Sequence, residues 1–127
     1  MEILDLKGSL KFSPERHVYT VLADTPFCSV SVVGWEPGQS SPIHSHPGAD
    51  EVYHVLEGEG LFSDGRKESR VGPGGTVFFP AGEAHRVRSL GRMVLYRVQA
   101  GADRHPEPLE GWPPRERQDA SPHITSA

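Results

Sequence analysis

The sequence predicts an all-β protein folded as a jelly-roll or related β-barrel, and three observations support this fold class. Short apolar runs alternate with polar residues at every second position, which is the period of a half-buried strand. The 14 glycines and 12 prolines fall between these runs, where tight turns need them. No stretch shows the apolar period of a helix longer than a turn or two. Many short strands at regular spacing can close into a barrel, which also removes exposed sheet edges.

Each expected strand ends at a turn sequence. The strands cover residues 17–23, 27–35, 42–46, 51–60, 61–71 as a hairpin, 76–80, 84–90 and 92–99. The segments "EPGQ", "HPGAD", "SDGR", "GPGG", "PAGE" and "SLGR" carry Gly, Pro or Asp at the reversals. Since 127 residues are enough for one domain with one core, we expect a single barrel over residues 1–102.

The C-terminal residues 103–127 have a different character. They are polar, rich in proline and without any apolar period, so we expect an arm that is extended or disordered. Trp112 leaves an alternative open, because burying so large a side chain stabilises by about 2–3 kcal/mol. The arm could therefore dock on its own domain or on a neighbouring one.

Composition argues against membrane and nucleic-acid partners. No apolar run approaches the length of a membrane span, and the N-terminus lacks the basic and apolar regions of a signal peptide. The net charge is −4, and the basic residues are spread singly rather than clustered. The single cysteine cannot form an internal disulfide. We expect a soluble, cytoplasmic protein.

Three histidines and one glutamate form the candidate metal site. His44 and His46 point to the same side, because side chains alternate along a strand. The turn "PGAD" lets the chain reverse and brings Glu51 back beside them, and His85 follows the turn in "PAGEA". This donor set suits one divalent transition metal per chain, Fe, Mn, Ni, Co or Zn. Four protein ligands leave two octahedral positions open, which is a property of catalytic sites.

The spacing of these residues resembles the two motifs of the cupins. The first motif, at 38–58, is filled at each fixed position, by Gly38, His44, His46, Glu51 and Gly58. The second, at 74–89, is filled by Gly74, Pro80, Gly82 and His85, but has Ser89 where the family has Asn. The resemblance implies a double-stranded β-helix barrel with the metal in its lumen, held by the three histidines and Glu51. It also implies a homodimer.

Other residues are weaker candidates for the site. Tyr53 shares the inward face with Glu51 and could donate a proton as a catalytic residue, although core packing is the alternative. His54 falls on the opposite face and is expected to be a bystander. Arg97 could bind a substrate carboxylate if its strand face is inward, or could reach solvent. Four aromatic residues could line the pocket or be ordinary core: Trp35, Phe62, Phe78 and Phe79.

The predicted function is that of a metal-dependent enzyme acting on a small oxygenated molecule, with a dioxygenase favoured first. A metal with two adjacent open positions can chelate a substrate, or hold it beside O₂. Two alternatives stay open. One is a redox-neutral isomerase, decarboxylase or lyase, and the other is a non-catalytic protein that binds or senses a small ligand.

Overall fold

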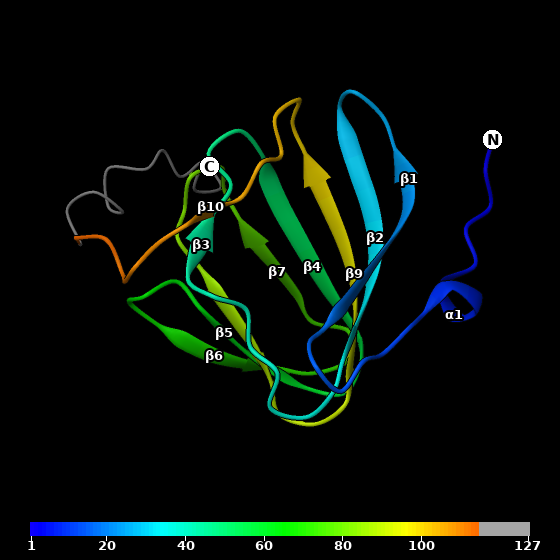
Figure 1. Cartoon of the computed structure of the whole chain (residues 1–127), viewed down its shortest axis with the longest axis horizontal. Helices are drawn as coiled ribbons and strands as arrows, with labels where there is room; N and C mark the ends of the chain where they lie inside the picture. Colours follow the sequence, from blue (N-terminus) through cyan, green and yellow to red (C-terminus); the bar gives the residue numbers. More distant parts are fainter. Residues whose placement is uncertain (115–127) are drawn as a thin grey trace.

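Ten strands, all paired antiparallel, build the part of the chain that the computed structural model describes, residues 1–114 (Figure 1). In chain order they are β1 (Val18–Asp24), β2 (Cys28–Trp35), β3 (His44–Ser45), β4 (Asp50–Glu57), β5 (Gly60–Ser63), β6 (Glu68–Val71), β7 (Thr76–Phe79), β8 (Arg86–Ser89), β9 (Met93–Ala100) and β10 (Glu107–Pro108). The expected strands are present, and β10 is an addition within the C-terminal arm. The all-β prediction is confirmed.

The strands form two layers that face each other (Figure 1). The larger layer is a five-stranded sheet in the order β1-β2-β9-β4-β7. The opposite layer contains the three-stranded sheet β6-β5-β8 and the pair β10-β3. The two parts of this second layer are joined because His44 and His85 exchange backbone hydrogen bonds of 3.1 and 2.8 Å. The result is the double-stranded β-helix architecture.

The core lies between the layers and follows the expected alternation. On β4 the inward residues Tyr53 and Val55 are fully buried, while Val52 and Leu56 on the outer face are only partly buried. The same alternation on β9 sends Leu95 inward. Burial of apolar side chains from both layers supplies the main stabilisation of a barrel of this size. The core cluster is Val33, Trp35, Tyr53, Val55, Phe62, Phe79, Val87, Met93 and Leu95.

The motif glycines occupy turns that other residues would strain. Gly58 has a φ of +75°, and a Cβ there would collide with the backbone of Arg92. Gly82 has a φ of +83° in the turn that precedes His85. Only glycine adopts this left-handed region without steric cost, so the turns that lead into the site depend on these positions.

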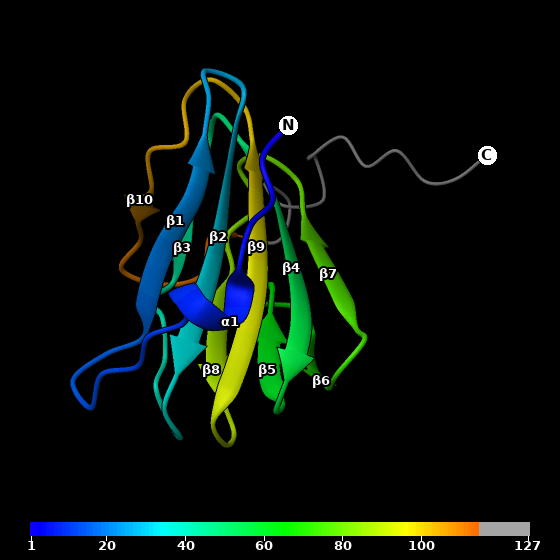
Figure 2. The same ribbon diagram turned by 90° about the vertical axis from the view of Figure 1, so that its right-hand side faces the viewer.

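Helical structure is limited to a single turn in the described residues. Helix α1 (Leu6–Ser9) begins after Asp5, whose carboxylate accepts a hydrogen bond of 3.0 Å from the Gly8 N–H. It lies on the outer side of the larger sheet (Figure 2). Within residues 1–114, no helix is long and apolar enough to cross a membrane.

The C-terminal arm runs along the barrel mouth as far as the structure describes it. In β10, Glu107 pairs with Ser45 and Pro108 pairs with His44. Before β10, Arg104 forms an ion pair with Asp24 at the end of β1. The expectation of disorder in this arm also concerns residues 115–127, which lie outside the described residues.

Trp112 docks on its own domain. Its ring covers Gly65, so closely that a Cβ on Gly65 would lie 2.6 Å from it, and the Arg86 guanidinium lies 5.7 Å from the ring centroid. The arm is therefore held at three points: by Arg104, by β10 and by Trp112.

Candidate metal centre

The four predicted ligands lie together inside the barrel. His44, His46, Glu51 and His85 are buried, with exposed fractions of 7, 5, 1 and 1%. One ligand atom from each residue lies within 4.8 Å of all the others. Bonds of about 2.1 Å to a shared metal would place cis and trans ligand atoms roughly 3 to 4 Å apart. The cluster therefore fits one metal ion with only small movements of the side chains.

Two separate strand–turn segments, residues 38–58 and 74–89, bring these ligands together. His44 is in β3, His46 follows it, and Glu51 is in β4 after the intervening turn. His85 comes immediately before β8, and its backbone pairing with His44 fixes the register between the two motifs. The ring centroids of His44 and His85 are 4.3 Å apart as a result.

Backbone carbonyls orient all three imidazoles. The Nδ1 atom of His44 lies 2.7 Å from the Pro42 carbonyl oxygen, and that of His85 lies 3.0 Å from the carbonyl oxygen of Glu83. The Nδ1 of His46 lies 3.2 Å from the carbonyl oxygen of Arg104 in the C-terminal arm. A carbonyl oxygen can only accept, so each Nδ1 carries the proton and each Nε2 keeps a free lone pair. This arrangement is typical of histidines that bind metals through Nε2.

Two buried atoms at the centre have no ordinary hydrogen-bond partner. The Oε1 atom of Glu51 and the Nε2 atom of His85 are 2.7 Å apart, yet neither has a hydrogen bond of normal geometry. The other carboxylate oxygen of Glu51 lies 3.4 Å from Nε2 of His46. Unsatisfied buried polar atoms are costly, and a cation between them would satisfy both.

The protonation states suit metal binding at neutral pH. Burial would raise the pKa of the Glu51 carboxyl, but His85, His46 and Arg97 beside it outweigh that effect and hold the pKa at about 2. Burial lowers the pKa of His44 to about 4, and its neighbour His85 adds to this effect. The site therefore offers a carboxylate and neutral imidazole, which are the forms that bind a divalent cation.

The inner face of β9 adds two polar side chains beside Glu51. Gln99 donates a hydrogen bond of 2.8 Å from Nε2 to Oε2 of Glu51. Arg97 reaches the same oxygen at 3.8 Å and donates to Ser31 at 3.4 Å. The side chain of Arg97 thus points inward, which is the condition under which the sequence predicted that it could bind a substrate carboxylate. The alternation that places Leu95 inward could also have identified Gln99, which was not among the predicted site residues.

A cavity of about 300 Å³ opens beside the metal cluster. Its wall includes two of the ligands, His44 and His46, together with Arg97. Tyr19 of β1 and His17, the residue before β1, face the same space. Two prolines of the C-terminal arm, Pro106 and Pro108, close another side. Small-molecule sites combine a few polar groups with apolar walls in this way.

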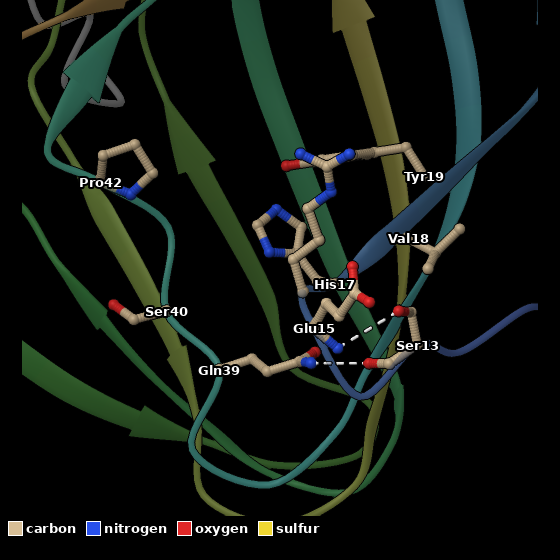
Figure 3. Close-up of a pocket in the computed structure, with 9 residues that line it drawn as sticks. Ser13, Glu15, His17, Val18, Tyr19, Gln39, Ser40 and Pro42 are labelled. Atoms are coloured by element: carbon tan, nitrogen blue, oxygen red, sulfur yellow. Dashed lines mark hydrogen bonds between the residues drawn. The ribbon is translucent and has the colours of Figure 1, made fainter.

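A larger outer cavity of about 820 Å³ continues from the first. The two cavities share His17, Tyr19 and Pro42 in their walls. Figure 3 shows His17 and Tyr19 on one side, and Ser40 and Pro42 on the other. His17 and Tyr19 were not predicted as site residues, because the pattern of residues 17–23 does not reveal which side of that strand faces the lumen.

Tyr53, the predicted proton donor, lies in the core behind Tyr19. It is 1% exposed and is absent from the walls of both cavities described above. Its hydroxyl is hydrogen-bonded to that of Tyr19. The structure thus places Tyr19 between Tyr53 and the cavity.

The remaining candidates separate clearly. His54 lies on the outer face, where its Nδ1 is 2.7 Å from the Thr76 hydroxyl. Phe78 is 57% exposed on the outer face of β7. The expectation that it lines the pocket or belongs to the core is therefore wrong. Phe79 instead stacks on His85 with ring centroids 4.1 Å apart, and Trp35 stacks on His17 at 4.0 Å. These two aromatic residues support the site from behind.

Ser89, which replaces the Asn of the second motif, has a structural role. It is 1% exposed, and its hydroxyl donates a hydrogen bond of 2.6 Å to the carbonyl oxygen of Glu36. The contact ties β8 to the turn at residues 36–39. The substitution leaves the ligand cluster intact.

Several known proteins resemble this chain. The family profile described as the cupin domain matches residues 31–107. The dimethylsulfoniopropionate lyase DddQ of Ruegeria pomeroyi is 37% identical over 93 residues, which are 69% of this chain and 46% of the lyase. The acireductone dioxygenase of Rhodopseudomonas palustris is 37% identical over 73 residues, which are 54% of this chain and 41% of the dioxygenase. The chain thus spans less than half the length of these two relatives.

A solved structure of similar size also resembles this chain. The protein TT1209 of Thermus thermophilus is 35% identical, with a TM-score of 0.74. The match covers 80% of this chain and 98% of TT1209. The likeness therefore extends over almost the whole of that barrel.

Proposed function

This chain belongs to the cupin family, and on that premise we propose that it is a metal-dependent enzyme that moves a proton on a small oxygenated molecule without oxidising it, as lyases and isomerases do. One observation carries the proposal. The cavity beside the metal ligands is lined by a phenol, Tyr19, and an imidazole, His17. A proton donor and a proton acceptor on one wall are what such a reaction requires of the protein.

The four ligands, His44, His46, Glu51 and His85, would hold one divalent transition metal from the group Fe, Mn, Ni, Co and Zn. Such an ion would polarise a substrate oxygen and make a neighbouring C–H bond more acidic. His44 and His46 line the same cavity as Tyr19 and His17, so a substrate held there would lie near both wall residues.

Tyr19 and His17 have complementary protonation states. Burial raises the pKa of the Tyr19 phenol, so its hydroxyl keeps its proton at neutral pH. Burial lowers the pKa of His17 to about 4, and Arg97 and Arg16 add to this effect, so the imidazole is neutral. We assign Tyr19 as the proton donor and His17 as the acceptor. Tyr53 then acts as a positioning residue, because its hydroxyl holds that of Tyr19.

A dioxygenase is the second candidate, and it is the one that the sequence favours first. Its support is the 37% identity with an acireductone dioxygenase over 54% of the chain. The match to a lyase covers more of this chain, 69%, at the same identity. Together with the proton-transfer groups in the cavity, this coverage is why we place the redox-neutral reaction first.

The experiment compares turnover with and without oxygen. The protein is purified, its metal is identified by elemental analysis, and small hydroxy and carboxylic acids are incubated with it in ²H₂O under anaerobic conditions. We expect exchange of one C–H proton for deuterium, or elimination, visible by ¹H NMR. Turnover only with O₂ uptake would establish the dioxygenase instead. Absence of both, with metal bound, would support a non-catalytic binding protein.

The assembly state is a separate proposal. The family resemblance implies a homodimer, and light scattering after gel filtration would measure it. A monomer would contradict this proposal without affecting the one on chemistry.

A further inference from the structure

Arg97 is a buried cation on the wall of the metal cavity. Its side chain is 12% exposed, and its guanidinium lies 4.0 Å above the centroid of the Tyr19 ring. The strand register places it between Ser31 on β2 and Tyr53 on β4. Its Nε atom is buried and has no hydrogen-bond partner. A positive charge with an unsatisfied donor thus borders a space of about 300 Å³.

Within residues 1–114, the acidic group that pairs with this guanidinium is Glu51, at 3.8 Å. That carboxylate is also a metal ligand, with its oxygens 2.7 Å from His85 and 3.4 Å from His46. When a divalent cation is bound, one carboxylate faces three positive charges, two from the metal and one from Arg97. Uncompensated buried charge is strongly unfavourable. The loaded site therefore lacks negative charge.

We propose that this charge comes from the substrate, and that the substrate is an organic carboxylate paired with Arg97 in the metal cavity. The proposal rests on the proposed function only in requiring a bound metal. A planar guanidinium matches the two oxygens of a carboxylate. The Tyr19 ring, 4.0 Å from the guanidinium carbon, and the Ser31 hydroxyl, 3.4 Å from one of its nitrogens, hold the guanidinium at the cavity wall.

The carboxylate would enter through the outer cavity. The two spaces share His17, Tyr19 and Pro42 in their walls (Figure 3), and the outer one is also lined by the charged residues Glu15 and Arg16. The rest of the substrate would point toward that opening, while its carboxylate lies beside Arg97.

The test measures binding rather than turnover. The probe is malonate, and its neutral analogue malonamide is the comparison, titrated by calorimetry into the protein loaded with the metal that it carries when purified. We expect malonate to bind at least tenfold more tightly than malonamide. We expect Arg97→Met to weaken malonate binding at least tenfold and to leave malonamide binding unchanged. Arg97→Lys, which keeps the charge, should weaken malonate binding less than Arg97→Met does.

A matched control is available on β8, where Arg88 is exposed and away from the cavity. Arg88→Met should leave both affinities unchanged. Metal binding supplies a further readout. If Arg97 serves as the anion partner, Arg97→Met removes a positive charge from beside the cation, so metal binding should be kept or become tighter. If Arg97 only supports Glu51, the variant should bind metal more weakly.

Two results would overturn the proposal. One is wild-type malonate affinity in an Arg97→Met protein that is folded and fully loaded with metal. The other is equal affinity of the wild-type protein for malonate and malonamide, which tests the proposal even where the Met variant does not fold. Neither result depends on turnover. Failure of the proposed reaction, with carboxylate binding intact, would therefore be seen separately.

Discussion

The two motif segments that carry the candidate metal ligands and the chain ends that close the cavity are built in different ways. The motif segments, residues 38–58 and 74–89, place the four candidate ligands through short spacings and glycine turns. Besides residues of the first motif segment, the cavity walls contain N-terminal residues between 13 and 19, Arg97 of β9, and Pro106 and Pro108 of the C-terminal arm, which are far apart in the chain. The candidate metal cluster is thus encoded within short segments, whereas the cavity beside it depends on long-range packing. Variants in the two regions should have separable effects.

The largest effect is expected in the two motif segments. His46→Ala removes a ligand and should lower metal affinity by at least about 100-fold, since changes that merely disturb the groups around a ligand cost 10- to 100-fold. Calorimetry and elemental analysis measure this loss. His54→Ala is the matched control, because His54 lies eight residues away on the outer face and should bind metal normally. Stoichiometric metal in the His46→Ala protein would contradict the ligand assignment.

The next effect concerns the cavity wall. Tyr19→Phe should slow the deuterium exchange about 100-fold, the range found for the loss of a proton-transfer group, while metal content stays unchanged. Tyr53→Phe should have a smaller effect, because Tyr53 acts only through its hydrogen bond to Tyr19. Equal rates in wild-type and Tyr19→Phe protein would remove Tyr19 from the reaction.

A smaller effect is expected at the C-terminal arm. Trp112→Ala should lower the free energy of unfolding by about 1–2 kcal/mol, because the ring is only partly buried on Gly65. Urea denaturation measures this change. Phe27→Ala offers an aromatic control. Because Phe27 is 77% exposed, this substitution should lower the free energy of unfolding only slightly. Full stability of the Trp112→Ala protein would show that the arm is not held by this contact.

The smallest effect is a pH dependence from His17. Its pKa is about 4 in the folded chain and about 6.5 in the unfolded chain, so the unfolded state binds more protons between these values. Stability should therefore fall as pH drops from about 6.5 toward 4. Solvent screening of this half-buried group limits the change to under about 1 kcal/mol. His17→Gln should flatten this part of the profile in metal-free protein, measured by urea denaturation at several pH values. An identical slope in both proteins would contradict it.

The alternation of side chains predicted the strands well, but it predicted the inward residues of β4 and not those of β9. Glu51, Tyr53 and Val55 share the inward side of β4, as the pattern indicated. The same pattern placed Arg97 on one side of β9 but did not say whether that side faces the lumen, because apolar residues occur on both faces of the larger sheet. Pairing of β9 with β2 and β4 decided this.

Tyr19 and Tyr53 show the limit most clearly. Both are inward, and the sequence alone selected Tyr53 because it lies beside Glu51. The two tyrosines lie at different depths in the core, however. Only the packing of β1 against β2 places Tyr19, rather than Tyr53, at the cavity wall. β10 was likewise missed, because two residues of a proline-rich segment carry no strand pattern of their own.

By itself the sequence determined the all-β class, the turns and the cluster of four candidate metal ligands, because these depend on side-chain alternation and on glycine positions within short segments. The tertiary structure decided which polar groups lie beside this cluster or line its cavity, namely Tyr19, His17, Arg97 and Gln99, and how the C-terminal arm closes the mouth of the barrel. The physical reason is the distance along the chain between the residues that interact. Local spacing fixes side-chain directions within one strand–turn segment, whereas the depth and orientation of a strand are set by the strands against which it packs.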